Sequence, residues 1–398
     1  MSDPAVVRRV LLARGIRAFG DGFVALLLPV YVLSLGMSPL QVGLIATGTL
    51  LGSAALTLAV GLQAWRFHER TLLLAACVLM AITGAGVVGF DSFQPLLLVA
   101  VVGTLNVSND DVSVFLPLEH AVLGSAAEPA RRTAAFGQYS LVGALVAALG
   151  AATAGVLPSA AVALDVDRGV ALRGMFALYG MLGLASLLVY RGLPDRRLSG
   201  LGEPAAPLQA SRPRVLALSA LFGLDAFGGG LVVQSMLALW LYTRFDLTVA
   251  VAGQVFFCAG VLSAASFLFV APVVERFGAL RTMLGSHVVA SGLLILMPLM
   301  PSAGGAIALL LLRATIASLD VPTRSAYVMS VVTPAERAAA ASFTIVPRSL
   351  AAAAGPLLAG WLLSQSPFGW QLVIAGSVKL VYDTLLYAHF RGVEGPPA

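Results

Sequence analysis

The chain has 398 residues; 59% of them are hydrophobic, 11% are charged, and the mean hydropathy is +0.94. These values exclude a soluble globular protein, because a core of this size cannot bury so much apolar surface, whereas a lipid bilayer can. The net charge of +5 and the pI of about 9.6 come from dispersed arginines rather than from a basic run, which argues against nucleic acid as a partner.

Twelve apolar segments follow one another along the chain, each about as long as the roughly 20 residues that a membrane-crossing helix needs. In chain order, the sequence predicts helices at residues 16–35, 39–62, 71–89, 93–115, 133–157, 170–190, 215–242, 249–274, 282–300, 304–327, 338–363 and 368–390. Lipid therefore surrounds most of the protein.

Arginines are distributed unevenly over the connectors between these helices. Sixteen lie in segments that alternate to one side, and three, Arg168, Arg173 and Arg244, lie in segments on the other. Positive charge stays on the cytoplasmic side of a membrane, so both termini are predicted to be cytoplasmic. The preference for Arg over Lys and the richness in Ala, Gly, Leu and Val suggest a GC-rich bacterial genome, and hence an inner membrane.

The two halves of the chain resemble each other. When the sequence is displaced by 205 residues, Arg132 coincides with Arg337 and Gly150 with Gly355. Two halves with the same orientation indicate a parallel repeat around an axis along the membrane normal. The predicted domains are an N-terminal six-helix bundle (1–193), a cytoplasmic linker (194–213) and a C-terminal six-helix bundle (214–398).

Two connectors carry a recognisable motif. The retained residues are Gly61, Arg66 and Arg70 after the second helix, and Glu275, Arg276 and Gly278 after the eighth. They resemble the G-x-x-x-D-R-x-G-R-R loop of the major facilitator superfamily of secondary transporters, and the resemblance extends over essentially the whole chain. It implies an all-α integral membrane protein with twelve transmembrane helices in two pseudo-symmetric six-helix bundles. It also implies that both loops act as conformational latches, although Trp65 replaces the acid of the first.

Glycines recur in the fifth and eleventh predicted helices, at Gly143, Gly150, Gly155, Gly355 and Gly360. This pattern resembles the antiporter motif of drug exporters in the superfamily and favours a drug/proton-antiporter-like bacterial member. Close helix packing explains the same glycines equally well.

Ionisable and amide side chains inside apolar spans are costly and mark functional sites. They are Arg17, Asp21, Asn106, Asn109, Asp110 and Asp111 in the first half, and Asp225, Arg313, Asp320, Arg348, Lys379 and Asp383 in the second. Asp21 and Asp225 occupy matching positions, and the resemblance places both on helices that line a central cavity. We predict Asp21, Asp225 and Asp110 as proton-coupling residues. The substrate-cavity candidates are Arg17, Asn106, Asn109, Asp111, Arg313, Asp320 and Arg348.

Partners for these charges follow from helical spacing. Residues four apart share a helix face, which makes Lys379 and Asp383 a candidate structural ion pair and places Arg17 beside Asp21. Asp225 has no such neighbour and is expected to reach Arg313 or Arg348.

The fourth predicted helix is the most polar. Helical spacing puts Asn106, Asp110 and Ser113 along one face of it. Glu119, nearer the cytoplasmic end, is expected to be solvated or paired with Arg131 and Arg132.

These observations favour secondary active transport of a small solute by alternating access, with proton-coupled efflux as the leading form. One alternative is symport or uniport of an organic anion bound by Arg313 and Arg348, and a second is a non-transporting receptor or scaffold. An enzyme is disfavoured, because the four histidines are scattered and no H-E-x-x-H or G-x-S-x-G motif is present. Cys77 and Cys258 have no metal-site spacing, so no metal or cofactor is expected. The expected partners are lipid, a small solute and protons, and the expected state is a monomer.

Overall fold

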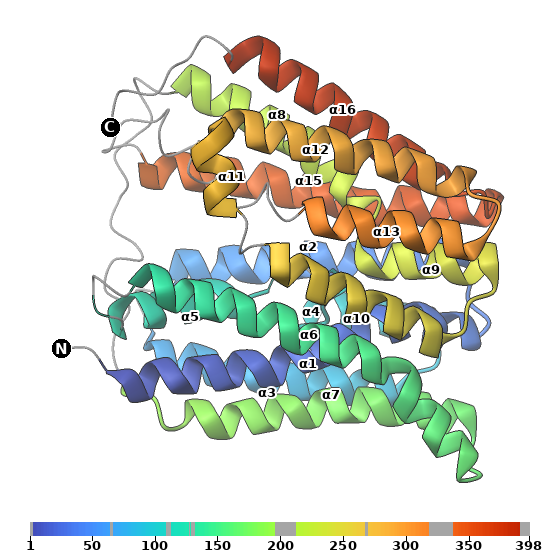
Figure 1. The fold of residues 1–398 in the computed structure, drawn as a ribbon. Helices are drawn as coiled ribbons and strands as arrows, with labels where there is room; N and C mark the ends of the chain where they lie inside the picture. The colour runs from blue at the N-terminus through green and yellow to red at the C-terminus, as the bar shows by residue number, and fades with distance from the viewer. Residues whose placement is uncertain are drawn as a thin grey trace. The chain divides into compact units, whose positions relative to one another are not determined.

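The computed structural model describes residues 3–63, 67–108, 113–126, 128, 132–195, 212–266, 270–317 and 337–390. Figure 1 shows that helices dominate these ranges. Eight of the helices described there are long and apolar enough to cross a membrane, and the shorter helices Phe93–Val102 and Ala303–Ala317 are also apolar. The predicted all-α integral membrane fold is confirmed.

The first of two compact units comprises Met1–Glu203 and Val233–Phe257. Its helices are α1 (Pro4–Ser34), α2 (Pro39–Gln63), α3 (Glu69–Gly89), α4 (Phe93–Val102), α5 (Phe115–Ala126), α6 (Arg132–Ala163), α7 (Arg168–Tyr190), α9 (Gln234–Phe245) and the first part of α10 (Val249–Ser266). Helix α1 packs along α6 and α7, and α3 packs along α7. Apolar side chains of α1, α3, α5 and α6 form the core of this unit.

The second unit comprises Pro204–Val232 and Cys258–Ala398. It contains α8 (Arg212–Gly230), the rest of α10, α11 (Val270–Phe277), α12 (Ala279–Leu296), η4 (Met297–Leu299), α13 (Ala303–Ala317), α15 (Arg337–Gln365) and α16 (Trp370–Phe390). Helix α8 packs against α15 and α16, and α12 packs against α13 and α16. Residues 196–211 of the predicted linker lie outside the described residues, and the predicted domain boundaries stay a prediction.

The start of α1 differs from the prediction. The helix begins at Pro4 rather than near residue 16. Asp3 is its N-cap and accepts hydrogen bonds from the backbone amides of Ala5 and Val6, at 3.1 and 3.3 Å. An acidic N-cap followed by proline is a strong helix start, and it extends α1 beyond its apolar run.

Glycines allow the long helices of each unit to approach closely. A Cβ atom on Gly150 of α6 would lie 2.1 Å from the carbonyl oxygen of Phe19 in α1. At the repeat-related position, a Cβ on Gly355 of α15 would lie 2.2 Å from the carbonyl carbon of Gly230 in α8. The glycine pattern that resembles an antiporter motif therefore serves helix packing in both units.

Candidate functional site

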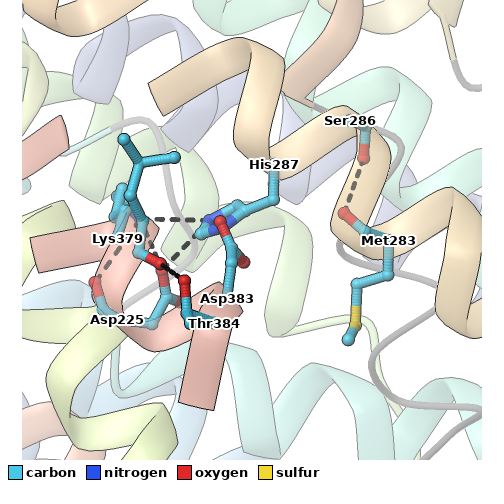
Figure 2. A network of polar contacts seen from close by, with 8 residues as sticks. Asp225, Met283, Ser286, His287, Lys379, Asp383 and Thr384 are labelled. Atoms are coloured by element: carbon cyan, nitrogen blue, oxygen red, sulfur yellow. Dashed lines mark hydrogen bonds and ion pairs between the residues drawn. The ribbon is translucent and has the colours of Figure 1, made fainter. Parts of the chain in front are cut away.

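Four buried ionisable residues meet in the second unit, as Figure 2 shows. Asp225 comes from α8, His287 from α12, and Lys379 and Asp383 from α16. Their exposed fractions are 3%, 7%, 9% and 3%. We call these four residues the Asp225 network.

Hydrogen bonds and ion pairs connect all members of the Asp225 network. The Lys379 ammonium donates to Asp225 Oδ1 over 2.5 Å, and His287 Nε2 lies 3.1 Å from the same oxygen. His287 Nδ1 lies 2.7 Å from Asp383 Oδ1. The network thus joins three helices through one histidine and one shared carboxylate oxygen.

The structure corrects two predicted partnerships. Lys379 binds Asp225 and Asp383 binds His287, so the two α16 residues reach to other helices rather than to each other. Asp225 likewise binds Lys379 and His287, whereas the sequence had suggested Arg313 or Arg348 as its partner. Residues four apart do share one face of α16, but that face is turned toward α8 and α12, where opposite charges are available.

His287 was not among the predicted site residues. The sequence contained a signal for it, because His287 lies in the middle of the apolar α12 rather than at its end. A titratable side chain at that depth belongs with the other intramembrane charges.

A second buried cluster lies in the first unit, around Glu119 of α5. The Arg17 guanidinium of α1 forms an ion pair with Glu119 Oε2, and the Tyr139 hydroxyl of α6 donates to the same oxygen over 2.6 Å. The Tyr190 hydroxyl of α7 donates to Glu119 Oε1. The Arg17 guanidinium also lies 3.9 Å from the ring centroid of Phe115. We call Arg17, Glu119, Tyr139 and Tyr190 the Glu119 cluster.

This arrangement overturns the expectation that Glu119 is solvated or paired with Arg132; Arg131 lies outside the described residues. Glu119 is fully buried, and Arg17 is 2% exposed. Sequence spacing had placed Arg17 beside Asp21, whereas the buried ion pair of Arg17 is with Glu119, 102 residues away. Asp21 lies one turn further along α1, and its side chain is partly exposed.

The fourth predicted helix is not continuous. Helix α4 ends at Val102, residues 104–108 are non-helical and buried, and α5 begins at Phe115. Asn106 Oδ1 accepts a hydrogen bond from the Ser108 amide over 3.1 Å, a local turn that competes with the helix. The predicted alignment of Asn106 with Ser113 on one helix face is therefore wrong. Asn109, Asp110 and Asp111 lie outside the described residues.

Hydrogen bonds from other parts of the protein satisfy backbone groups of this non-helical segment. The Tyr179 hydroxyl donates to the Thr104 carbonyl over 2.6 Å, and the Thr104 amide donates to Thr83 Oγ1 over 3.2 Å. The Ser235 amide, in the first turn of α9, donates to the Val107 carbonyl over 3.1 Å. Irregular backbone at membrane depth is tolerated only where it is buried in protein or lines a cavity.

The seventh predicted helix is also interrupted, at Leu231–Val233 between α8 and α9. Just after this break, Gln234 and Ser235 are 6% and 0% exposed. Their side-chain polar atoms make no hydrogen bond within the described part of the chain. Broken helices with polar groups are where transporters bind their substrates. We call Asn106, from the break after α4, together with Gln234 and Ser235, which directly follow the break after α8, the polar break.

The remaining predicted residues are dispersed. Arg313 is half-buried on α13, Arg348 is exposed on α15, and Asp320 lies outside the described residues. In the first latch loop, Gly61 lies in the last turn of α2, Arg70 lies in the first turn of α3, and Arg66 lies outside the described residues. In the second, Glu275 and Arg276 are exposed on α11. Gly278 has a φ of +81°, which favours glycine at the turn into α12.

Comparison with known proteins identifies the family. The Major Facilitator Superfamily model matches residues 10–319, more than three quarters of the chain. An uncharacterised membrane protein of Saccharomyces cerevisiae, YJR124C, is 22% identical over 418 residues, covering 95% of this chain and 92% of the relative.

Solved structures share the fold. A bacterial homologue of the human lysosomal transporter Spinster, inward-facing and unoccupied, has a TM-score of 0.73 and 16% identity, with full coverage of both chains. The nucleoside transporter NupG has a TM-score of 0.73 and 13% identity, covering 98% of this chain and 100% of that one. The human organic anion transporter MFSD10 has a TM-score of 0.68 and 17% identity, covering 96% and 99%. These proteins are transporters rather than enzymes, and their common fold is the predicted twelve-helix arrangement. By its sequence match over most of its length, the chain described here belongs to the Major Facilitator Superfamily.

Proposed function

We propose that this protein is a secondary active transporter that exports a small solute by alternating access, driven by an inward flow of protons. Membership in a transporter superfamily supports the transport of a solute across the membrane. Proton coupling, direction and solute are the specific parts of this proposal.

The observation that carries proton coupling is the position of Asp225. One of its carboxylate oxygens contacts both Lys379 and His287 in a site closed to water. A buried carboxylate shared between an ammonium and an imidazole cannot change its protonation without rearranging its partners. Such a rearrangement means that two conformations of the protein bind a proton with different affinities, which is the thermodynamic requirement for coupling.

A flux experiment tests the proposal. Purified protein is reconstituted into liposomes, and solute movement is measured with and without an imposed pH gradient. We expect the gradient to drive solute against its concentration difference, and we expect D225N to lose this drive. D91N is the matched control, because Asp91 forms an exposed ion pair with Arg173. Full gradient-driven transport by D225N would contradict a coupling role for Asp225.

Asp21 is the second proposed coupling residue. It lies on α1 with a partly exposed side chain, so it can reach water more readily than Asp225. The same flux measurement on D21N decides between the two carboxylates: gradient-driven transport that persists in D21N removes Asp21 as a proton carrier.

The solute panel distinguishes the remaining alternatives. Lipophilic cations suit a cavity with several acids, whereas organic anions suit the proposed clamp of Arg313 and Arg348. Nucleosides and organic anions also belong in the panel, because NupG is a nucleoside transporter and MFSD10 is an organic anion transporter. Transport of an anion that is lost in R313Q and R348Q would favour the anion alternative. Flux no higher than in protein-free liposomes, for every solute, would favour a receptor or scaffold.

The proposed location is the inner membrane of a bacterium, with both termini in the cytoplasm and the protein acting as a monomer. The excess of arginines in one set of connectors supports this orientation. Tags at the two termini should be digested only when protease reaches the cytoplasmic face of sealed vesicles.

A further inference from the structure

We infer that His287 is the proton-binding residue of this protein, and that the bound proton decides whether Asp225 of α8 stays attached to α12. This inference rests on the proposed proton coupling and assigns it to a residue that was not among the predicted site residues. It follows from which atoms in the Asp225 network can donate hydrogen bonds.

Both ring nitrogens of His287 face carboxylate oxygens. Nδ1 lies 2.7 Å from Asp383 Oδ1, and Nε2 lies 3.1 Å from Asp225 Oδ1. A neutral imidazole has one donor and one acceptor, and an ionised carboxylate only accepts. Both contacts are attractive when two hydrogens are present, either on an imidazolium or on a neutral imidazole beside one protonated carboxyl group. In both cases the three groups hold one proton more than neutral His287 with two carboxylates would.

The charges of the network favour the same additional proton. Asp225 and Asp383 contribute two negative charges, and Lys379 contributes one positive charge, all within a region closed to water. With neutral His287 these four groups together sum to one negative charge, and a net charge is expensive inside a membrane. With the additional proton its net charge is zero.

Among the residues that the structure describes, the imidazole makes its ionic contacts with Asp225 and Asp383, and Lys379 lies beside it. Its neighbours on α8 and α16 include Asp225, Lys379 and Asp383, together with the ring of Tyr382, whose centroid lies 5.5 Å away. The other helices that pack on α12 carry Glu275 and Arg276 in α11, and Arg313 in α13. Asp383 Oδ2 is buried and makes no hydrogen bond among the described residues, so the imidazole is the hydrogen-bond partner of that carboxyl group.

Loss of the proton exchanges one bond for another. When the proton leaves Nε2 for the aqueous phase, a nitrogen lone pair faces Asp225 Oδ1, and this contact must break. Lys379 Nζ already lies 3.4 Å from Nε2 and can donate a hydrogen bond to it. Nδ1–H continues to donate to Asp383. Helices α12 and α16 therefore stay connected, while the direct bond between α12 and α8 is lost.

Nuclear magnetic resonance of the ring nitrogens tests this assignment without any transport measurement. The protein carries four histidines, and substituting the other three (H68Q, H120Q and H389Q) leaves His287 alone. In nanodiscs containing 15N-histidine protein, we expect two protonated ring nitrogens at low pH and loss of one proton as the pH is raised over the range in which the protein stays folded. H287Q in the otherwise natural chain checks the assignment by removing the same signal. A His287 signal that stays neutral, or that never changes over this range, overturns the inference.

Flux in liposomes provides the functional readout. H287Q should lose the stimulation of transport by a pH gradient, by about 5–150-fold if the coupling free energy is typical. H120Q is the matched control, because His120 packs edge-on against Phe136 and Tyr139 in the other unit. If a pH gradient drives transport but His287 does not titrate, this inference is rejected and the proposed function still stands. A protein that moves no solute rejects the proposed function, while the resonance measurement still decides the proton site.

Discussion

Arg17 of α1 and Glu119 of α5 form a buried ion pair that connects residues 102 positions apart in the chain. Tyr139 and Tyr190 complete the hydrogen bonding of the carboxylate, so α1, α5, α6 and α7 all meet at Glu119. Four helices of the first unit are therefore connected through one buried carboxylate.

Replacing Glu119 with glutamine should destabilise the protein strongly. E119Q leaves the Arg17 charge buried without a counter-ion, and breaking such a pair costs about 3–5 kcal/mol. Thermal unfolding in detergent measures the effect. D91N removes an exposed ion pair whose loss costs about 1 kcal/mol or less, and it serves as the control. Equal midpoints for E119Q and D91N would contradict the structural role of the cluster.

The Asp225–Lys379 pair should show strong energetic coupling. K379M removes the ammonium group that binds the buried Asp225 carboxylate, and we expect a loss of about 3–5 kcal/mol. The double variant D225N/K379M removes both charges together and should be more stable than the sum of the single losses predicts. A double-mutant cycle from unfolding midpoints measures this coupling. Additive effects would show that the two charges do not stabilise each other.

The close contact between α1 and α6 can be tested at a single glycine. A Cβ on Gly150 meets the Phe19 carbonyl oxygen, so G150A must push the two backbones apart, at a cost of about 1–3 kcal/mol. Gly137, on the same helix, has no atom within 4 Å of its Cβ position. G137A should be neutral or stabilising by up to about 1 kcal/mol, because alanine is the better helix former. A G150A protein as stable as G137A would refute the close approach.

The polar break should affect solute binding more than folding. The Gln234 amide is buried and makes no hydrogen bond within the described residues, so Q234M should leave the unfolding midpoint unchanged or raise it. Because a polar side chain without a protein partner is available to a solute, Q234M should weaken solute-induced stabilisation. Q371M changes an equally buried glutamine on α16 and should leave that stabilisation intact. Equal solute response in both variants would remove Gln234 from the binding site.

Sequence periodicity predicted several helices closely. The predicted segments at 39–62, 71–89 and 368–390 correspond to α2, α3 and α16, whose ends differ from the prediction by at most two residues. Apolar length decides these helices, because a segment in lipid must satisfy its own backbone. The break after Val102 escaped prediction, although Gly103 and the polar residues that follow it were visible. A run of apolar residues on both sides suggested a continuous helix. The interruption is stable because the backbone groups of Thr104 and Val107 form hydrogen bonds with other helices.

The sequence identified most residues of the candidate site, but it did not identify which of them form pairs. Asp225, Lys379 and Asp383 were each identified as intramembrane charges, whereas His287 and Glu119 were set aside. The pairs that form join α8 to α16, α12 to α16, and α1 to α5. Helical spacing can relate residues only within one helix, so it proposed Lys379 with Asp383 and Arg17 with Asp21.

The amino-acid sequence by itself determined that this protein lies in a membrane, where its apolar segments run and which charges they carry into lipid. Composition and hydrophobic length decide these properties locally, because each segment meets the bilayer independently of its neighbours. The tertiary structure alone decided which charges neutralise each other and where two helices break. Those outcomes depend on which helix faces come together, and a charge in lipid is stable only beside the opposite charge that packing brings to it.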